Sequence, residues 1–266
     1  MGLFGKKVCV KCGKECGMFG STSTEDEKVL CSDCAKLAGK EFSSYDHTYE
    51  QYLAMVERYN ENEKKLQKFH IDKVYYNRIF VDTANNWIAV TKYSVYKKEN
   101  MYKEHPHIYD AKDLMLFNQG VSIKKQEPGV FKTTVYVDFS TMMVFEDEFV
   151  PCPLNEVVES GRKVEVKGVF KQKAEGLYTQ ADLEIFNYAT EILNAKGLER
   201  PAEMEKGDKV ESLDKYAAWF KMLFDLEKRK ILNKKHINTI LENLVENMGT
   251  FEKVKMPEEI RKRFGA

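Results

Sequence analysis

Two Cys-x-x-Cys pairs near the N-terminus restrict the fold of residues 1–42 more than any other feature of the sequence. Cys9 and Cys12 form the first pair, Cys31 and Cys34 form the second, and eighteen residues separate the two pairs. Each pair can place two thiolates on one side of a metal ion, and zinc takes four such ligands in a tetrahedron. The second pair meets the start of a predicted helix, whose N-terminal N–H groups favour thiolates. The spacing therefore predicts one zinc ion in a treble-clef or zinc-ribbon module over residues 1–42.

Two of the six cysteines lie outside these pairs. Cys16 could replace Cys12 as a ligand or remain a free thiol beside the site. Cys152 lies between two prolines, which indicates a structural residue at a turn, because no base that would activate a catalytic thiol is recognisable. The alternative to a zinc site is a pair of disulfides. The spacing favours zinc, and we expect a structural ion because four thiolates leave no open position for water or substrate.

The charge balance and the hydropathy of the chain restrict its partners and its compartment. Lysine plus arginine equals aspartate plus glutamate at 42 each, so the formal net charge is zero. A strongly electrostatic binder of nucleic acid or of an anionic membrane usually has a basic excess. The N-terminus lacks the apolar core of a secretory signal, and no run of about 18 apolar residues occurs. Because unpaired thiols and a zinc site fit a reducing compartment, the sequence predicts a cytoplasmic protein.

The remaining chain changes from helical to alternating periodicity and back, which predicts an α+β multidomain protein. Residues 43–69 are expected to form a linker helix in which Thr48 and Gln51 make a capping box. Residues 70–197 are expected to form one β domain with a C-terminal helix. Residues 70–173 alternate β-branched and aromatic residues with polar ones. The helix that follows is capped by Thr179 and Asp182 and ended by Gly197. The expected strands are 73–81, 87–93, 108–116, 122–126, 133–139 and 164–170.

Antiparallel strands followed by one amphipathic helix are typical of a pleckstrin-homology-like (PH-like) β barrel with a capping helix, and the periodicity equally allows another small α+β sandwich. The apolar stripe of that helix is expected at five positions: Leu183, Phe186, Ala189, Ile192 and Leu193. Residues 198–211 have the composition of a linker, and residues 212–266 predict an α-helical hairpin with a tail. Two helices of this length cannot bury both apolar faces alone, so they dock on the β domain or associate with another chain.

Three parts of the sequence resemble a family of bacterial and phage proteins. The two cysteine segments, 9–14 and 30–34, resemble its N-terminal four-cysteine zinc-ribbon domain of unknown function, the family numbered 4428. Residues 81–90 and 108–114 resemble the central β segment of these proteins, and residues 224–237 resemble the short C-terminal oligomerisation domain that they often carry. The resemblance implies a zinc ribbon, a PH-like middle and a small helical association module, and it supplies no catalytic residues.

Catalytic constellations are weak in this sequence. His105 and His107 could offer two imidazoles to a metal, with Asp110 or Asp113 as carboxylate partners, but Pro106 between them favours an exposed loop. The acidic segment 146–148 is typical of a solvated hairpin end. No serine or cysteine has a recognisable base and no glycine-rich phosphate loop occurs, so we do not expect an enzyme.

The sequence therefore favours a non-enzymatic zinc-binding interaction or sensor protein that binds a protein partner and associates through its C-terminal helices. The alternative is a nucleic-acid-binding protein or nuclease-type effector, suggested by the lysines and phenylalanines around the first cysteine pair: Lys6, Lys7, Lys11, Lys14, Phe4 and Phe19. Seven acids balance seven lysines over residues 1–47, which counts against it. Lipid binding through the PH-like domain ranks third and a membrane role is not expected, because its lysines form only pairs at 97–98 and 124–125.

Overall fold

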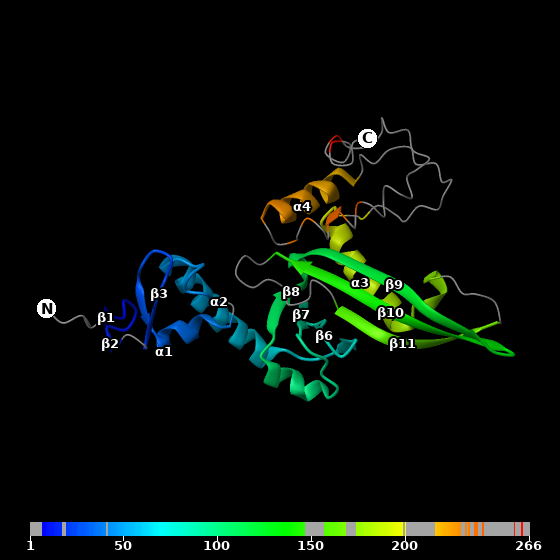
Figure 1. Cartoon of the computed structure of the whole chain (residues 1–266), viewed down its shortest axis with the longest axis horizontal. Coiled ribbons are helices and arrows are strands. Elements are labelled where there is room, and N and C mark those ends of the chain that lie inside the picture. Colours follow the sequence, from blue (N-terminus) through cyan, green and yellow to red (C-terminus); the bar gives the residue numbers. More distant parts are fainter. Residues whose placement is uncertain are drawn as a thin grey trace. The chain divides into compact units, whose positions relative to one another are not determined.

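The computed structural model describes residues 7–17, 20–40, 42–146, 157–168, 174–198 and 216–229, together with positions 200, 232, 234, 237, 238, 241, 258 and 262; for residues 157–161 and 174–175 it describes the backbone alone. The described chain is a mixed α+β structure with several small antiparallel sheets (Figure 1). Contacts divide it into two units, the described residues up to Tyr109 and the described residues from Asp110 onward. The change of unit falls inside the range 70–197 for which the sequence predicted one β domain.

The first unit begins with two small antiparallel hairpins and two short helices. The elements are β1 (Lys7–Val8), β2 (Glu15–Cys16), β3 (Ser21–Ser23), β4 (Val29–Cys31), α1 (Ser32–Ala35) and the 3₁₀ helix η1 (Lys36–Ala38). β1 pairs with β2, and β3 pairs with β4. The buried residues of this module are mostly cysteines, with Leu30 and Ala38. Such a small core needs stabilisation from elsewhere, because segments of this size rarely fold alone.

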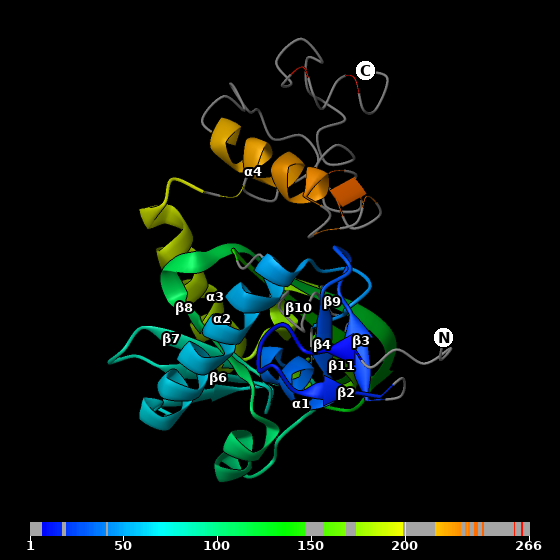
Figure 2. The ribbon, with the colours of Figure 1, turned by 90° about the vertical axis from the view of Figure 1, so that its left-hand side faces the viewer.

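Helix α2 (Tyr49–Lys68) begins at the predicted capping box, which is confirmed. Thr48 Oγ1 accepts a hydrogen bond from the Gln51 N–H at 3.3 Å, and Gln51 Oε1 accepts one from the Thr48 N–H at 2.8 Å. The N-terminal half of α2 packs into the cysteine core through three side chains: Tyr52, Met55 and Val56. Near its C-terminal end, Leu66 belongs to the core of the next sheet. The predicted linker helix is therefore a packed element that takes part in two cores (Figure 2).

A four-stranded antiparallel sheet completes the first unit. Its strands, in spatial order, are β5 (Lys73–Tyr75), β6 (Ile79–Asp82), β7 (Trp87–Val90) and β8 (His107–Asp110), with the 3₁₀ helix η2 (Lys98–Glu104) before β8. The prediction of one strand over 73–81 was wrong, because the chain reverses direction within it. Tyr76 and Asn77 both adopt φ +54°, and the Arg78 N–H donates to the Tyr75 carbonyl at 3.0 Å.

A buried asparagine attaches α2 to the start of β8. Asn62 is 3% exposed, its Nδ2 donates to the Pro106 carbonyl at 3.0 Å, and its Oδ1 accepts from the Ile108 N–H at 2.6 Å. One side chain thus satisfies two backbone groups at the start of β8, the Pro106 carbonyl and the Ile108 N–H. The backbone of α2 cannot do so, because its own N–H and carbonyl groups are paired within the helix.

Replacing Asn62 with alanine should destabilise the first unit by about 2–6 kcal/mol, because two buried backbone groups lose their partner at about 1–3 kcal/mol each. Urea unfolding followed by circular dichroism measures the change. Asn60→Ala, two residues earlier on the exposed face of the same helix, is the matched control and should shift the midpoint little. Equal effects of the two substitutions would contradict this role of Asn62.

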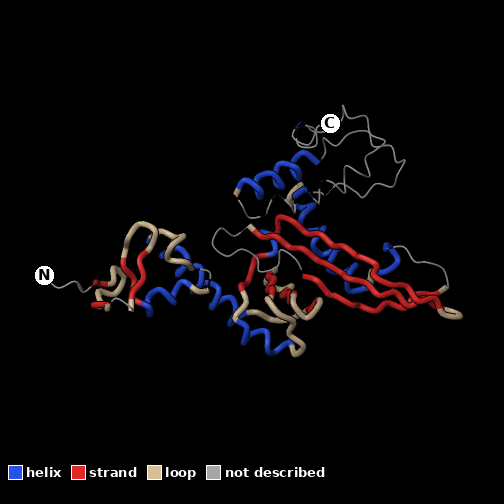
Figure 3. The backbone as a smooth tube through the Cα atoms, viewed as in Figure 1, coloured by secondary structure: helices blue, strands red, loops and turns tan. Residues whose placement is uncertain are grey.

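The second unit contains a three-stranded antiparallel sheet with longer strands (Figure 3). They are β9 (Leu114–Pro128), β10 (Lys132–Phe145) and β11 (Val157–Lys167), with β10 in the centre. The predicted strands 122–126 and 133–139 lie within β9 and β10. The predicted strand 108–116 is interrupted by the 3₁₀ helix η3 (Ala111–Asp113), so β8 ends in one sheet and β9 begins in another. Residues 169–170 of the last predicted strand lie outside the described residues.

Helix α3 (Gln180–Ala195) is attached to this sheet at its N-terminus. Its capping box between Thr179 and Asp182 forms as predicted. The Asp182 carboxylate is fully buried and accepts from both terminal nitrogens of Arg162 in β11, Nη1 at 3.2 Å and Nη2 at 2.6 Å. From β9, the Gln119 side chain donates to the Asp182 carbonyl at 3.1 Å. The cap residue therefore also connects the helix to two strands.

The buried face of α3 differs from the predicted stripe. Leu183 and Phe186 are 47% and 40% exposed, whereas the buried positions besides Asp182 are Ile185, Ala189 and Leu193, of which Ala189 and Leu193 were predicted. The pairing of Asp182 with Arg162 turns that position toward the sheet, and the residues three and seven positions later follow it. Gly197 ends the helix as predicted: it adopts φ +67°, and the Leu198 N–H bonds to the Leu193 carbonyl at 2.9 Å.

Helix α4 (Ala217–Lys228) is the first helix of the predicted C-terminal hairpin. Its buried side chains are Trp219, Phe220, Met222, Leu223 and Leu226, whereas Ala217 is exposed. Ser212, Cys152, the linker and most of the second helix and the tail lie outside the described residues. The hairpin as a whole stays a prediction.

Candidate metal centre

The first cysteine pair lies in the turn between β1 and β2. The Gly13 N–H donates to the Cys9 carbonyl at 2.8 Å, and the Cys9 N–H donates to the Lys14 carbonyl at 2.9 Å. Gly13, directly after Cys12, adopts φ +74°, a conformation that glycine reaches without steric cost. This tight turn directs both thiols of the pair to the same side.

The second pair lies where β4 runs into α1. Cys31 ends the strand and caps the helix, because its Sγ accepts a hydrogen bond from the Cys34 N–H at 3.4 Å. The Cys34 carbonyl in turn accepts from the Tyr52 hydroxyl of α2 at 2.8 Å. The helix start, the strand end and α2 thus fix the position of the second pair.

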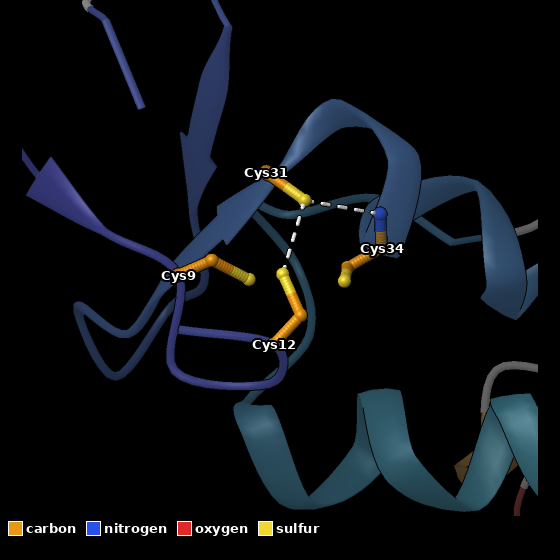
Figure 4. Close-up of side chains that lie close together, drawn as sticks. All are labelled: Cys9, Cys12, Cys31 and Cys34. Atoms are coloured by element: carbon orange, nitrogen blue, oxygen red, sulfur yellow. Dashed lines mark hydrogen bonds between the residues drawn. The ribbon is translucent and has the colours of Figure 1, made fainter. Parts of the chain in front are cut away.

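All four thiols converge on one point (Figure 4). The sulfur atoms lie within 4.8 Å of one another, and Cys12 Sγ is 3.8 Å from Cys31 Sγ. A tetrahedral ion bound at about 2.3 Å by each sulfur requires sulfur atoms about 3.8 Å apart. Cys9, Cys31 and Cys34 are buried, and Cys12 is exposed. The four cysteines predicted from the sequence are therefore positioned to hold a metal ion.

Electrostatics within the cluster distinguish the thiols. Burial raises the pKa of Cys9, but hydrogen bonds from the backbone N–H groups of Cys31, Cys12 and Lys11 outweigh it and lower this pKa to about 6. Burial raises the pKa of Cys34, as do hydrogen bonds with the other three thiols. Several thiolates close together repel one another, and a bound cation replaces this repulsion with attraction and lowers their pKa values. Since protons and metal compete for the sulfurs, the cluster binds metal less tightly as the pH falls.

Cys16 lies near the cluster and outside it. Its side chain is 6% exposed and donates to the Lys14 carbonyl at 3.3 Å. Burial raises its pKa, and the neighbouring thiols Cys31 and Cys9 raise it further. Cys16 is thus a buried thiol of β2 that lies outside the group, and Cys12 is the fourth member of the group that could hold a metal ion.

The other candidate metal ligands do not form a second centre. Among the described residues, the four cysteines are the one group of three or more histidine, cysteine or acidic side chains that could share an ion. His105 adopts φ +44° and its Nδ1 lies 3.3 Å from Glu63 Oε1, while His107 begins β8 and packs against the Tyr109 ring. A cavity of about 50 Å³ beside them holds little more than water, and its lining includes both histidines, Tyr59 and Lys40. Glu146 is exposed, and the rest of its acidic segment lies outside the described residues.

A buried carboxylate that the sequence analysis did not identify proves to be structural. Asp82 is fully buried and accepts hydrogen bonds from the His70 N–H at 2.8 Å and from the backbone and side chain of Asn85 at 3.0 and 2.9 Å. Burial raises its pKa, but these hydrogen bonds lower it below the ordinary value. Asp82 therefore closes the turn between β6 and β7 as a carboxylate and is not placed to transfer protons.

No family model, curated protein or solved structure matches this sequence. Among the described residues, no helix combines the length and the apolar character needed to cross a bilayer.

Proposed function

We propose that this chain is a non-enzymatic zinc-binding interaction protein whose N-terminal module holds one structural zinc ion and docks on a protein partner. The observation that supports it most is the convergence of four sulfur atoms from two turns on one point. Four thiolates suit zinc, and they complete its coordination, so the ion stabilises the module and has no position left for substrate.

Native mass spectrometry of the purified chain is expected to show one zinc ion per chain, and denaturing spectra should show the metal-free mass. Cys12→Ser should lower zinc occupancy strongly, because it removes a ligand that is exposed and therefore easily replaced without disturbing the core. Cys16→Ser is the matched control and should retain the ion. Iron at this site, or full occupancy after Cys12→Ser, would contradict a four-cysteine zinc centre.

The surface of the module supports a protein partner. Val8, Val10 and Leu37 are 52%, 47% and 46% exposed, and they lie within or next to the segments that carry the cysteines. Exposed apolar side chains with polar surroundings are typical of protein interaction sites. Affinity capture from the native host, compared between the wild type and a Val10→Ser/Leu37→Ser variant, tests this role. A partner retained equally by both proteins would contradict docking through this surface.

Nucleic-acid binding is the weaker candidate for the same module. Lys14, one of the lysines that suggested it, lies 3.1 Å from the Asp33 carboxylate, and Lys11 Nζ lies 5.9 Å from the centre of the Tyr52 ring. Fluorescence anisotropy with labelled single-stranded RNA and DNA at low salt distinguishes the two functions. Tight, salt-dependent binding would favour the nucleic-acid alternative.

The PH-like arrangement of residues 70–197 and the association of C-terminal helices are also proposals, as is membership of the bacterial and phage family. The apolar face of α4 is buried within this single chain, which fits docking of the helix on its own chain, so association with another chain is proposed from the sequence pattern alone. The native mass of the full chain measures association directly, and a strictly monomeric protein at micromolar concentration would contradict it.

A further inference from the structure

The turn between β9 and β10 exposes two large apolar side chains. Val130 is 79% exposed and Phe131 is 86% exposed, the largest exposure of any phenylalanine among the described residues. All residues from 127 to 132 are exposed, and the turn lies at the far end of the paired strands (Figure 1). Burial of a phenylalanine is strongly favourable, so a turn that keeps one in water suggests a surface that it enters.

The backbone of this turn is fixed. The Gly129 N–H donates to the Lys132 carbonyl at 2.7 Å, and Pro128 pairs with Thr133 directly below the turn. A Cβ atom at Gly129 would lie 2.9 Å from the Lys132 carbonyl oxygen, so the turn requires glycine there. The Phe131 carbonyl accepts from the Gly168 N–H at 3.1 Å, at the end of β11. The two apolar side chains are thus presented by a turn that neighbouring strands hold in place.

Positive charge surrounds these side chains. Five lysines lie on the three strand ends next to the turn: Lys124, Lys125, Lys132, Lys163 and Lys167. The three acids of the same region are all paired with these lysines: Glu127 with Lys125 at 2.5 Å, Asp138 with Lys124 at 3.1 Å, and Glu165 with both Lys132 at 2.6 Å and Lys163 at 3.9 Å. Residues 128–132 contain no acid. Val130 and Phe131, called the apolar tip below, are therefore surrounded by more lysines than acids.

The sequence contains the same tetrapeptide a second time at this place. Gly-Val-Phe-Lys occurs at residues 129–132 and again at residues 168–171. The first residue of the second copy, Gly168, is the one that donates to the Phe131 carbonyl. Residues 169–171 lie outside the described residues.

We propose that the β9–β10 turn inserts Val130 and Phe131 into the interfacial region of an anionic phospholipid membrane, with Lys132 and its neighbours over the head groups. Aromatic side chains favour that region, and long lysine side chains reach the phosphates from it. A stable protein interface buries about 800 Å² on each partner, far more than two side chains supply, whereas a bilayer accepts a small tip. The even charge balance of the whole chain conceals this local excess.

Co-sedimentation of the full chain with vesicles of phosphatidylcholine alone, and with about one third phosphatidylserine, tests the proposal. We expect binding to the anionic vesicles that weakens as salt is raised. Val130→Ser/Phe131→Ser should lower the partition coefficient about 10-fold or more, since it removes the apolar insertion. Tyr93→Ser/Tyr96→Ser removes two other highly exposed aromatic rings, which lie in the first unit, and should leave binding unchanged.

Three results would overturn the proposal: no binding to anionic vesicles at low salt, equal binding to both vesicle types, or equal binding of the Val130→Ser/Phe131→Ser variant. Loss of self-association in that variant without vesicle binding would show that another protein chain covers the tip. Circular dichroism of each variant verifies that the sheet is folded. The tip and the metal centre are in different units, so a failure here leaves the zinc proposal unaffected.

Discussion

Replacing Cys31 with serine is expected to unfold the N-terminal module while the β9–β11 sheet stays folded. Cys31 supplies one of the four sulfurs and also caps α1. Zinc contributes about 10–16 kcal/mol to the folding of zinc-finger peptides, which is as much as the stability of a whole domain. Since Tyr52, Met55 and Val56 pack on the cysteines, the first half of α2 should also lose protection. Hydrogen exchange with mass spectrometry should therefore show faster exchange over residues 7–56.

The matched control is Cys16→Ser. Cys16 is buried in the same module and lies outside the group of four thiols, so this variant should retain the metal and exchange nearly as the wild type does. Treating the wild type with a chelator should reproduce the exchange pattern of Cys31→Ser. Unchanged protection of residues 7–40 in both cases would show that the module folds without an ion.

Replacing Arg162 with methionine should destabilise the second unit by about 3–5 kcal/mol, because it leaves the Asp182 carboxylate buried without its counter-charge. Asp182 is fully buried, and the Arg162 side chain is 14% exposed and also lies with its Cζ 4.8 Å from the centre of the Phe139 ring. Methionine keeps much of the packing of the arginine side chain, so the loss of stability measures mainly the removal of the positive charge. Urea unfolding, with hydrogen exchange of β10 as a local measure, determines the effect.

Lys163→Met is the matched control for this substitution, because Lys163 is the next residue on β11 and is exposed. It should change stability little, as surface ion pairs contribute little. Adding Asp182→Asn to Arg162→Met should recover part of the loss, since the amide removes the buried charge and keeps an acceptor for Thr179. An Arg162→Met variant as stable as Lys163→Met would contradict the importance of the buried pair.

The parts of the structure that depend on short-range chemistry could be predicted from the sequence. The four cysteines, the capping boxes at Thr48 and Thr179 and the terminating Gly197 each act over a few residues, and the structure places all of them as expected. Features that depend on distant partners could not be predicted. Asp182 is a helix cap by sequence, and its burial follows from Arg162, twenty residues earlier.

The misplaced strands have a similar physical origin. The turn after β5 uses Tyr76 and Asn77 with positive φ, and neither glycine nor proline marks it. The break between β8 and β9 falls at the 3₁₀ helix Ala111–Asp113, which is too short to show a helical period in the sequence. The exposed Val130 and Phe131 resemble ordinary strand residues in sequence, and their exposure follows from the turn that Gly129 makes.

Because α2 takes part in two cores, one at each end, the two cores are kept in a fixed rotational phase. Inserting one residue in the middle of this helix would rotate one end against the other by about 100° and lengthen it by about 1.5 Å. A protein that binds the cysteine-containing end of the unit would therefore act on the β5–β8 sheet through this helix. The number of residues in α2 therefore sets the rotation of the cysteine cluster about the helix axis relative to the β5–β8 sheet.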